Sequence, residues 1–489
     1  MKDRFMGHVL PELPEGHFIG GAFVEGRSAR KMESFDPGTG EAFGCFALGG
    51  AGEVDQALRA AEAGLRHWRR VKPADRSAVL HQVANVIRAN ADDLALVEVL
   101  DSGKTLAEAE GDVSGAARIF DYYAGAADKL DGRAVDLGPA QTGFTRREPV
   151  GVTAHVIPWN YPTSTFARGV APALAAGCSV VAKPAETTPF GALLLARLLS
   201  EAGVPDGVVN VVTGLGTEAG AALVADPRVN HITFTGSVVT GVAVSRAAAP
   251  NVTRMTLELG GKSPLIACAD ADPEKVAEAA IWAIFSNAGQ ICSAGSRLLL
   301  DGAIEEEMLE LLTAKTRALR FGHGLRNPDM GAVNSELHLS RINAHVVAAR
   351  DRGCRILTGG QRAVDPETGK GWFFEPTVIA DLPPEDPVVQ HEIFGPVLAV
   401  QRFESEAEAI HLANGTEFGL QASVFSRDIG RAMRMVQEID AGSVTVNDYW
   451  AGGIELPFGG NGKSGYGREK GLEALDAYTT VKSVAISHA

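Results

Sequence analysis

Four apolar segments read GVTAHVIP at residues 151–158, SVVAKP at 179–184, GVVNVVTG at 207–214 and HITFTG at 231–236. Segments of helical composition join them, such as PTSTFARGVAPALAAG (162–177) and TTPFGALLLARLLSEAG (187–203). In the latter, Pro189 stands just inside the expected start and Gly203 at the end, the usual asymmetry of helix termini. Strands buried on both faces read as near-continuous apolar runs. The alternation therefore predicts an α/β fold with a parallel, doubly wound sheet.

The sequence on either side extends this pattern. Residues 18–46 predict short strands with turns, and helices follow to about Lys129, one of them behind Asp75 as its N-cap. A second α/β segment begins near Leu259 and continues to about residue 455. The last segment, TTVKSVAIS (479–487), alternates like an edge strand. We expect such a strand to pair across a subunit boundary.

Composition excludes several classes of protein. The chain has 489 residues, 45% of them hydrophobic and 21% charged, so it is globular and long enough for two or more domains. The net charge of −15 argues against nucleic acid and anionic membranes as partners. Five scattered cysteines without a CxxC pair indicate a reducing compartment. With no apolar run of signal-peptide or membrane-helix length, we expect a cytoplasmic protein.

Cys292 is a candidate nucleophile because small residues surround it in NAGQICS (287–293), so that a ligand could approach closely. The alternative is a buried structural cysteine, which is the commoner fate of a single Cys. Glu258 lies in an apolar segment that ends in Gly260-Gly261. If it is buried, it could act as a general base near neutral pH. The alternative is a salt bridge at a strand end, with Lys262 as its partner.

Other candidates lie where the predicted strands end. Asn160 follows the first strand and could donate a hydrogen bond to an oxyanion, although Asn beside Pro is also common in turns. The glycine loop 214–220 misses the dinucleotide fingerprint by one residue. Ser237 could meet a phosphate at a helix N-terminus, and Lys183 with Glu186 could hold ribose hydroxyls. The alternatives are ordinary turns and a solvated surface pair.

Two common enzyme motifs are missing. His391-Glu392 resembles the start of HExxH, but residue 395 is Gly, so we predict no metal site. No GxSxG segment is present, which argues against the usual serine hydrolase.

Taken together and in this order, the motifs closely resemble the signature blocks of the NAD(P)-dependent aldehyde dehydrogenase superfamily. The resemblance runs from about residue 18 to the end of the chain. The blocks are VIPWNYP (156–162), KPAE (183–186), FTGS (234–237), LELGGKSP (257–264), NAGQICSAGSR (287–297), EIFGPV (392–397) and PFGGNGKSGYGRE (457–469).

The resemblance implies roles for individual residues. Cys292 matches the nucleophile, Glu258 the general base of deacylation, and Asn160 the side-chain donor of the oxyanion site. NAD is the implied cofactor, because Glu186 would repel the 2′-phosphate of NADP. The residues matched to cofactor binding are Ile157, Trp159, Lys183, Glu186, Gly216, Gly236, Ser237, Leu259, Glu392 and Phe394.

The aldehyde substrate is the least determined part of this interpretation. The matched positions are Tyr161, Arg168, Ile291 and Ser293. Arg168 is shared with relatives acting on succinic semialdehyde and on aromatic aldehydes, but the second carboxylate-binding Arg of the former is Ser286 here. Arg168 therefore either binds a polar substrate group or forms a structural salt bridge. A neighbouring carboxylate would indicate the salt bridge. Gly462 replaces the usual Lys after PFGG, which puts specificity in doubt.

The resemblance also implies how the chain is organised. We expect a dinucleotide-binding domain from residues 1–128 and 148–258, joined by part of 456–476. A catalytic domain would span 259–455, and strands at 129–147 and 477–489 would form an oligomerisation element of a homodimer or homotetramer. The alternatives are a CoA-acylating semialdehyde dehydrogenase, which typically lacks the carboxylate at Glu258, and a non-catalytic relative, which should have lost Cys292, Glu258 or Asn160.

Overall fold

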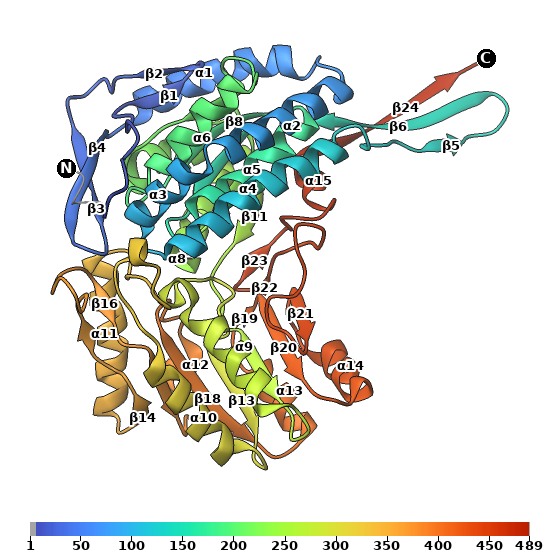
Figure 1. Ribbon diagram of the computed structural model, residues 1–489. Coiled ribbons are helices and arrows are strands. Elements are labelled where there is room, and N and C mark those ends of the chain that lie inside the picture. Colours follow the sequence, from blue (N-terminus) through green and yellow to red (C-terminus); the bar gives the residue numbers. More distant parts are fainter. Residues whose placement is uncertain (1–5, 489) are drawn as a thin grey trace.

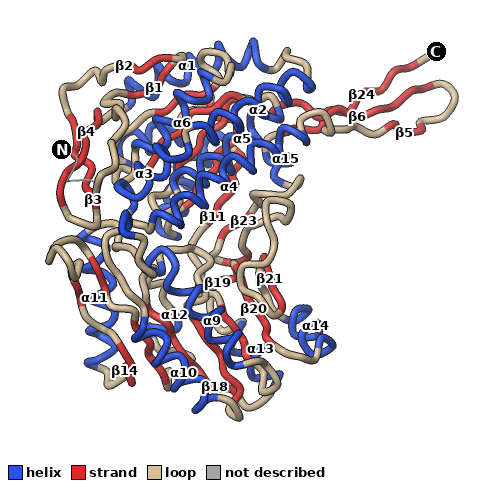
Figure 2. The backbone as a smooth tube through the Cα atoms, viewed as in Figure 1, coloured by secondary structure: helices blue, strands red, loops and turns tan. Residues whose placement is uncertain are grey.

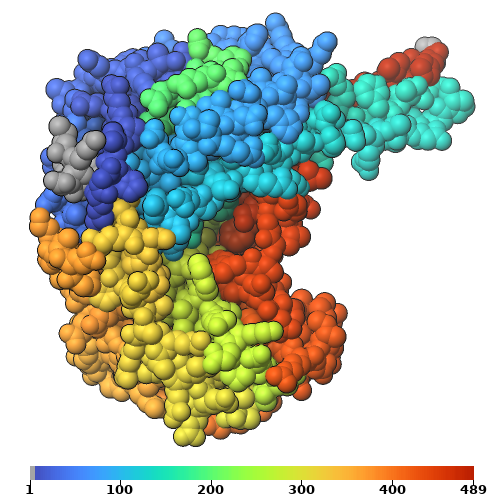
Figure 3. Space-filling model, in the orientation of Figure 1, coloured from blue at the N-terminus to red at the C-terminus, as the bar shows by residue number. Residues whose placement is uncertain are grey.

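The computed structural model describes residues 6–488 and contains two α/β units and a projecting β arm (Figure 1). Each unit is built on a sheet that is mostly parallel and covered by helices. Within the described residues no helix has both the length and the apolarity to cross a bilayer. Between the two units the surface is hollowed beside the red C-terminal segments (Figure 3).

The first sheet has the strand order β2-β1-β9-β8-β7-β10-β11-β23. Its central strands are parallel, as the apolar segments predicted. They are β7 (Val152–Ile157), β8 (Ser179–Pro184), β9 (Val209–Val211), β10 (Val229–Thr235) and β11 (Arg254–Glu258). The antiparallel edges are β1 (His17–Ile19), β2 (Ala22–Val24) and β23 (Gly465–Tyr466).

Helices cover both faces of this sheet and bury its core. One face carries α2 (Pro73–Ala89), α3 (Ala91–Ser102), α4 (Leu106–Ala126), α5 (Pro162–Ala176) and α6 (Phe190–Glu201). The other carries α1 (Ala51–Trp68), α7 (Ala221–Val224) and α8 (Val238–Ala248). The short helical turns are η2 (Gly216–Gly220), η3 (Ala249–Asn251), η4 (Ser286–Gly289) and η5 (Gly324–Arg326).

Two predicted helix starts were wrong. Asp75 is not the N-cap of α2, because Lys72 is the cap and Pro73 occupies the first helical position. Proline has the φ angle of a helix and lacks the N–H that would be unpaired there, so it starts this helix without a side-chain cap. Pro189 is the N-cap of α6 and not its first residue.

The second sheet has the order β14-β17-β18-β13-β12-β20-β21, and only its edge strand β14 is antiparallel. Its strands are β12 (Pro264–Ala267), β13 (Arg297–Asp301), β14 (Arg355–Thr358), β17 (Thr377–Ala380), β18 (Val397–Phe403), β20 (Gln421–Phe425) and β21 (Ser443–Val446). The helices of this unit are α9 (Pro273–Phe285), α10 (Glu305–Ala318), α11 (Glu336–Asp351), α12 (Pro387–Gln390), α13 (Glu406–Ala413) and α14 (Ile429–Glu438).

Small elements complete the fold. Strands β3 (Lys31–Asp36) and β4 (Glu41–Ala47) form a hairpin, and α15 (Ala474–Ala477) leads into the last strand. The two-residue strands pair as β15 (Arg362–Ala363) with β16 (Phe373–Phe374), and as β19 (Phe418–Gly419) with β22 (Asn461–Gly462).

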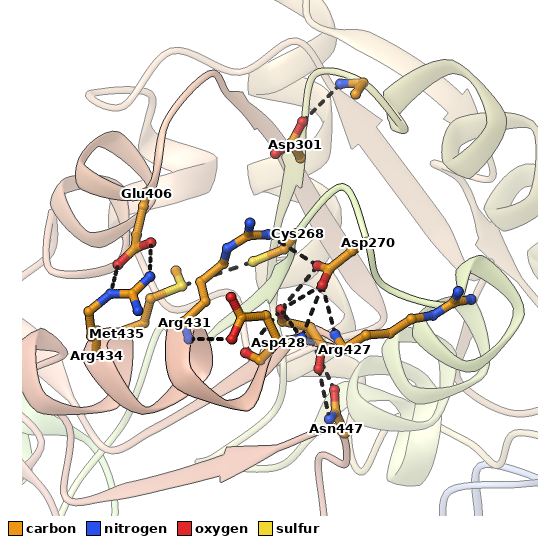
Figure 4. Close-up of polar contacts among 12 residues, drawn as sticks. Cys268, Asp270, Asp301, Glu406, Arg427, Asp428, Arg431, Arg434, Met435 and Asn447 are labelled. Atoms are coloured by element: carbon orange, nitrogen blue, oxygen red, sulfur yellow. Dashed lines mark hydrogen bonds and ion pairs between the residues drawn. The ribbon is translucent and has the colours of Figure 1, made fainter.

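Asp270 lies just beyond the carboxyl ends of β12 and β20 in the second sheet (Figure 4). Its carboxylate accepts hydrogen bonds from Ser426 Oγ at 3.0 and 3.1 Å, from the backbone N–H groups of Arg427 and Asp428 at 3.0 and 3.1 Å, and from Arg431 at 3.2 Å. Ligands of doubly wound sheets usually bind in such a crevice. In this protein the Asp270 carboxylate accepts the hydrogen bonds of the N–H and hydroxyl donors at this position.

The arm is a sheet of β5 (Ala134–Asp136), β6 (Gln141–Pro149) and β24 (Thr479–Ser487) (Figure 2). The extent of β24 matches the predicted strand. It pairs along its whole length with β6 of its own chain, from Thr479 opposite Pro149 to Ser487 opposite Gln141. Because β24 is an edge strand of this sheet, its pairing across a subunit boundary stays a prediction. Strand β6, in the hairpin at residues 134–149, is the partner strand that the sequence alone did not identify for β24.

Candidate active site

Cys292 lies between α9 and β13, after a strained turn. Asn287 and Ala288 in this turn have φ angles of +47° and +52°, in the left-handed region that a residue other than glycine rarely adopts. The turn brings the backbone of Cys292 against Gly261, where a Cβ atom would lie 2.6 Å from the Cys292 carbonyl oxygen. The Gly-Gly pair after β11 is therefore needed so that the two units can approach closely.

Asn160 lies beside this turn. Its side-chain Nδ2 donates a hydrogen bond to the carbonyl oxygen of Gln290 at 2.8 Å, and Asn287 Nδ2 donates to the carbonyl oxygen of Asn160 at 3.1 Å. Asn160 is buried at the end of β7. The structure thus brings a buried amide donor to the loop that carries Cys292, although 130 residues separate Asn160 from Gln290.

Glu258 ends β11, is 1% exposed, and neither of its oxygens has a hydrogen-bond partner among residues 6–488. The alternative salt bridge with Lys262 was wrong, because Lys262 Nζ is itself buried without a hydrogen-bond partner among those residues. Burial, and next the charge of Glu469, raise the pKa of Glu258 well above its usual range, while Arg168, Arg468 and Lys470 lower it. A buried carboxyl of this kind can take up a proton near neutral pH.

The Cys292 thiol is half-buried, whereas Cys178 and Cys268 are fully buried, as expected for structural cysteines. Burial raises the pKa of Cys292 to about 11, Arg168 opposes the rise, and Glu258 and Glu392 add to it. The thiol is therefore protonated at neutral pH in this state. To act as a nucleophile it must pass its proton to a nearby base.

The residues predicted to bind the adenosine half of the cofactor lie along the carboxyl edge of the first sheet. Lys183 is the second-last residue of β8, and its Nζ donates a hydrogen bond to Glu186 Oε2 at 3.1 Å. The Lys183 side chain is buried and that of Glu186 is 38% exposed, so only the carboxylate of this pair faces solvent. Ser237 caps α8 by accepting a hydrogen bond from Thr240 N, and nothing lies within 4 Å of a Cβ built on Gly216. A Cβ on Gly236 would lie 2.7 Å from the ring of Phe234.

Aromatic rings and a carboxylate gather near Gly260. The rings of Trp159 and Phe394 are 5.3 Å apart. Phe394 has a φ of +58°, and its carbonyl oxygen lies 2.7 Å from His338 Nε2, which donates if that nitrogen carries the proton. Glu392 accepts a hydrogen bond from Gly261 N at 2.9 Å, and burial raises its pKa to about 7.

Sequence analysis missed His338, since no motif marked it. The two apolar positions of the predicted set are also buried, Ile157 at the end of β7 and Leu259 against Gly241.

The predicted substrate positions surround the thiol. Ile291 and Ser293 are buried on either side of Cys292, and the Ser293 carbonyl oxygen accepts a hydrogen bond from Tyr449 Oη at 2.7 Å. Tyr161 directly follows Asn160, and Lys104 Nζ lies 4.3 Å from the centre of its ring. The sequence analysis named neither Tyr449 nor Lys104.

Arg168 lies two turns into α5 and forms a buried ion pair with Glu469. An acidic neighbour is what the salt-bridge alternative predicted. The pair nevertheless belongs to the site, because Arg168 lies close enough to affect the pKa values of both Cys292 and Glu258.

The chain thus has an α/β fold with a half-buried thiol, Cys292, at the junction of two units. The family model described as "Aldehyde dehydrogenase family" matches residues 23–484, and the chain belongs to this family. The identification of the family from the sequence motifs is thereby confirmed.

Individual relatives agree with this assignment. A hydroxyisobutyraldehyde dehydrogenase from Mycolicibacterium austroafricanum is 40% identical over 96% of this chain and 93% of its own. A betaine aldehyde dehydrogenase from Staphylococcus aureus, solved in complex with NAD+, superposes with a TM-score of 0.97 at 35% identity, covering 100% of this chain and 97% of its own. An NAD-dependent aldehyde dehydrogenase from Sinorhizobium meliloti gives a TM-score of 0.95 at 38% identity, with 97% and 95% covered.

Proposed function

We propose that this chain oxidises an aldehyde to the carboxylic acid with NAD as the electron acceptor. The observation that carries the proposal is the meeting of three groups from distant segments. A half-buried thiol, Cys292, lies in the loop that accepts the hydrogen bond of the Asn160 amide, and the free buried carboxyl of Glu258 affects its pKa.

The residues at the carboxyl edge of the first sheet fit NAD. Lys183 with Glu186 offers a cation and a carboxylate for ribose hydroxyls, and the turn at Gly216 is open. Glu392 offers a second carboxylate beside the rings of Trp159 and Phe394. Ile157, Gly236, Ser237 and Leu259 complete the proposed set. When bound, NAD supplies the acceptor for the hydride that leaves the substrate.

The residues of the chain would act in sequence. Cys292, once deprotonated, attacks the aldehyde carbon, and Asn160 Nδ2 stabilises the oxyanion of the hemithioacetal. A donor of this kind accounts for about 10²–10³ in rate. Loss of hydride leaves a thioester on Cys292. Glu258 then takes a proton from water, which attacks the thioester and releases the acid.

The test is NADH formation, followed by absorbance, with aliphatic, aromatic and ω-carboxylated aldehydes. It is run with and without free CoA. We expect NADH and free acid without CoA. A requirement for CoA would identify the acylating alternative, and no NADH with any aldehyde would favour a non-catalytic relative.

The substrate class we propose is a polar aldehyde. One relative is named for hydroxyisobutyraldehyde and another for betaine aldehyde, which are both small and polar. Semialdehydes and polar aromatic aldehydes fall in the same class. Tyr161, Arg168, Ile291 and Ser293 would contact the substrate. Gly462, in the strand pair of β22 with β19, replaces the family's usual Lys. Its φ of +57° lies in the left-handed region that favours glycine, and a Cβ there would lie 2.8 Å from the carbonyl oxygen of Glu417.

We also propose the arrangement of the chain in the cell. Residues 1–128 and 148–258, with part of 456–476, would bind NAD, and 259–455 would carry the nucleophile. The arm at 129–147 and 477–489 would mediate a homodimer or homotetramer in the cytoplasm. The pairing of β23 with β11 supports the assignment of 456–476 to the first unit.

A further inference from the structure

The turn that leads to Cys292 has an unfavourable backbone conformation. Three successive residues, Asn287, Ala288 and Gly289, have φ angles of +47°, +52° and +73°. Glycine adopts such angles readily, whereas Asn287 and Ala288 are strained there. Strain of this kind persists only where the surrounding structure compensates for it. The contacts that hold this turn therefore bear on the placement of Cys292.

A carboxylate from the first unit holds the start of the turn. Glu108 lies in the first turn of α4, and its Oε1 accepts a hydrogen bond from the Asn287 backbone N–H at 2.6 Å, although 179 residues separate the two. Asn287 is buried just beyond the end of α9. A buried N–H without an acceptor is costly, and a carboxylate is a stronger acceptor than a neutral group. Glu108 is therefore well suited to hold the strained turn in place.

The second oxygen of Glu108 has a different role, at the start of its own helix. Glu108 Oε2 accepts hydrogen bonds from Thr105 N and Thr105 Oγ1, both at 2.9 Å, and Thr105 Oγ1 accepts one from Glu108 N at 3.3 Å. This reciprocal arrangement is a capping box, which stabilises the N-terminus of α4. Because each oxygen bonds to a different segment, substitutions can separate the two roles.

The turn that Glu108 holds also carries the contacts of Asn160. Asn160 Nδ2 donates a hydrogen bond to the carbonyl oxygen of Gln290 at 2.8 Å, and Asn287 Nδ2 donates one to the carbonyl oxygen of Asn160 at 3.1 Å. The residue whose N–H is held by Glu108 is thus also bonded to the residue that would stabilise the oxyanion. A shift at Asn287 would move the Asn160 amide and the Cys292 thiol relative to each other.

We propose that Glu108 is a positioning residue for the reaction at Cys292, because its Oε1 anchors the strained turn at 287–289 and so fixes the thiol relative to the Asn160 amide. This inference rests on the proposed function and adds a residue that would act through the turn. A misplacement of reacting groups by about 1 Å can lower a rate about a hundredfold. Loss of the anchor should therefore lower kcat. The KM for NAD should not change, because the proposed NAD contacts do not include this turn.

The first test uses substitutions that separate the two oxygens of Glu108. Glu108→Ala removes both roles, so kcat should fall at least tenfold while the KM for NAD stays within threefold. Glu108→Gln keeps an acceptor for Asn287 N and should keep at least a third of kcat. The matched control, Thr105→Val, removes the capping hydroxyl and leaves the anchor, so it should lower the melting temperature and keep kcat within threefold. A folded Glu108→Ala enzyme with unaltered kcat, or an equal loss of kcat in Thr105→Val, would overturn the inference.

The second test reports on the turn without aldehyde oxidation. Burial is the largest cause of the raised pKa of Cys292, so release of the turn should expose the thiol and speed its alkylation. We expect iodoacetamide at pH 8 to modify Cys292 at least threefold faster in Glu108→Ala than in Thr105→Val. Equal rates would overturn the inference. Absence of NADH with every aldehyde in the unaltered enzyme would instead contradict the proposed function, and the alkylation rates would still decide the role of Glu108.

If Glu108→Ala does not fold, Glu108→Asp takes its place in both tests. An aspartate at this position can still complete the capping box with Thr105. Its side chain is one methylene shorter, so it would no longer reach Asn287 N while it caps the helix. We therefore expect the same loss of kcat and the same faster alkylation as for the loss of the anchor, and unaltered values in Glu108→Asp would overturn the inference.

Discussion

Cys292 and Glu258 share a buried environment that raises the pKa of both groups. Burial is the largest cause of both shifts. The charge of Glu258 raises the pKa of Cys292 further, and the charge of Glu469 raises the pKa of Glu258, because adjacent negative charges are unfavourable. Both shifts favour the uncharged form of the group concerned. Two predictions at the scale of single residues follow from this arrangement.

Alkylation of Cys292 should depend on pH in a way that reports its raised pKa. Only the thiolate reacts, so the iodoacetamide rate in the cofactor-free enzyme should keep rising through pH 9–10, consistent with a pKa of about 11. Mass spectrometry of the peptide containing Cys292 measures this rate, and Cys292→Ala identifies modification of other cysteines. A rate that levels off below pH 8 would contradict the protonated thiol.

Substitutions at the two proposed catalytic positions, Cys292 and Glu258, should separate the half-reactions. Cys292→Ala should reduce aldehyde oxidation by at least about 10³, since no covalent intermediate can form, while NAD binding persists. Glu258→Gln should retain a burst of NADH and slow the later turnover, because it cannot accept a proton from water. Stopped-flow absorbance resolves the burst. Turnover of Glu258→Gln at the unaltered rate would assign water activation to another group.

The choice between NAD and NADP should depend on a single residue, Glu186. Glu186 is partly exposed beside Lys183, where a carboxylate would repel the 2′-phosphate of NADP. We expect kcat/KM to be at least tenfold higher with NAD than with NADP. Glu186→Ser should reduce this ratio mainly by improving NADP. Equal efficiency with both cofactors in the unaltered enzyme would reject this role of Glu186.

At the scale of elements, the sequence predicted those strands and motifs whose signal is local. The parallel strands were visible because their residues are apolar without interruption, and β24 because its residues alternate. Asn160, Glu258 and Cys292 could be named because each lies in a short motif. The partner of Arg168 could not be predicted, because Glu469 is 301 residues away and only the packing of α5 on the C-terminal segment brings them together.

The turn held by Asp270 gives a prediction for one element. Asp270→Ala would remove the acceptor for two backbone N–H groups and for the hydroxyl of Ser426, all in the turn between β20 and α14. Water can reach this partly exposed turn, so we expect a loss of about 1–2 kcal/mol in the free energy of unfolding. Thermal denaturation measures the change, with Arg434→Ala on the neighbouring exposed pair as the control. An equal effect of both substitutions would show that the carboxylate of Asp270 has no special importance.

At the scale of the whole molecule, the arm is the feature least explained by a single chain. Strands β5, β6 and β24 extend away from both units, and β24 exposes side chains such as Val481 and Ile486 to solvent (Figure 1). A small sheet without a core of its own is marginal in water, and its free edges can pair with another chain. These observations support the proposed role of the arm in the assembly of subunits.

Removing β24 is the direct test of that role. Deleting residues 479–489 would leave this edge of β6 unpaired along its full length, from Pro149 to Gln141, and would remove one of the three strands of the arm. We expect the unaltered protein to be a dimer or tetramer by light scattering and the truncated protein to shift toward monomer. Because the catalytic residues lie outside the arm, NAD binding should persist in the truncated chain even where activity falls. A stable, active monomer of the full chain would contradict the proposal, whereas a truncated chain that keeps its oligomeric state would place the interface elsewhere, on the two large units.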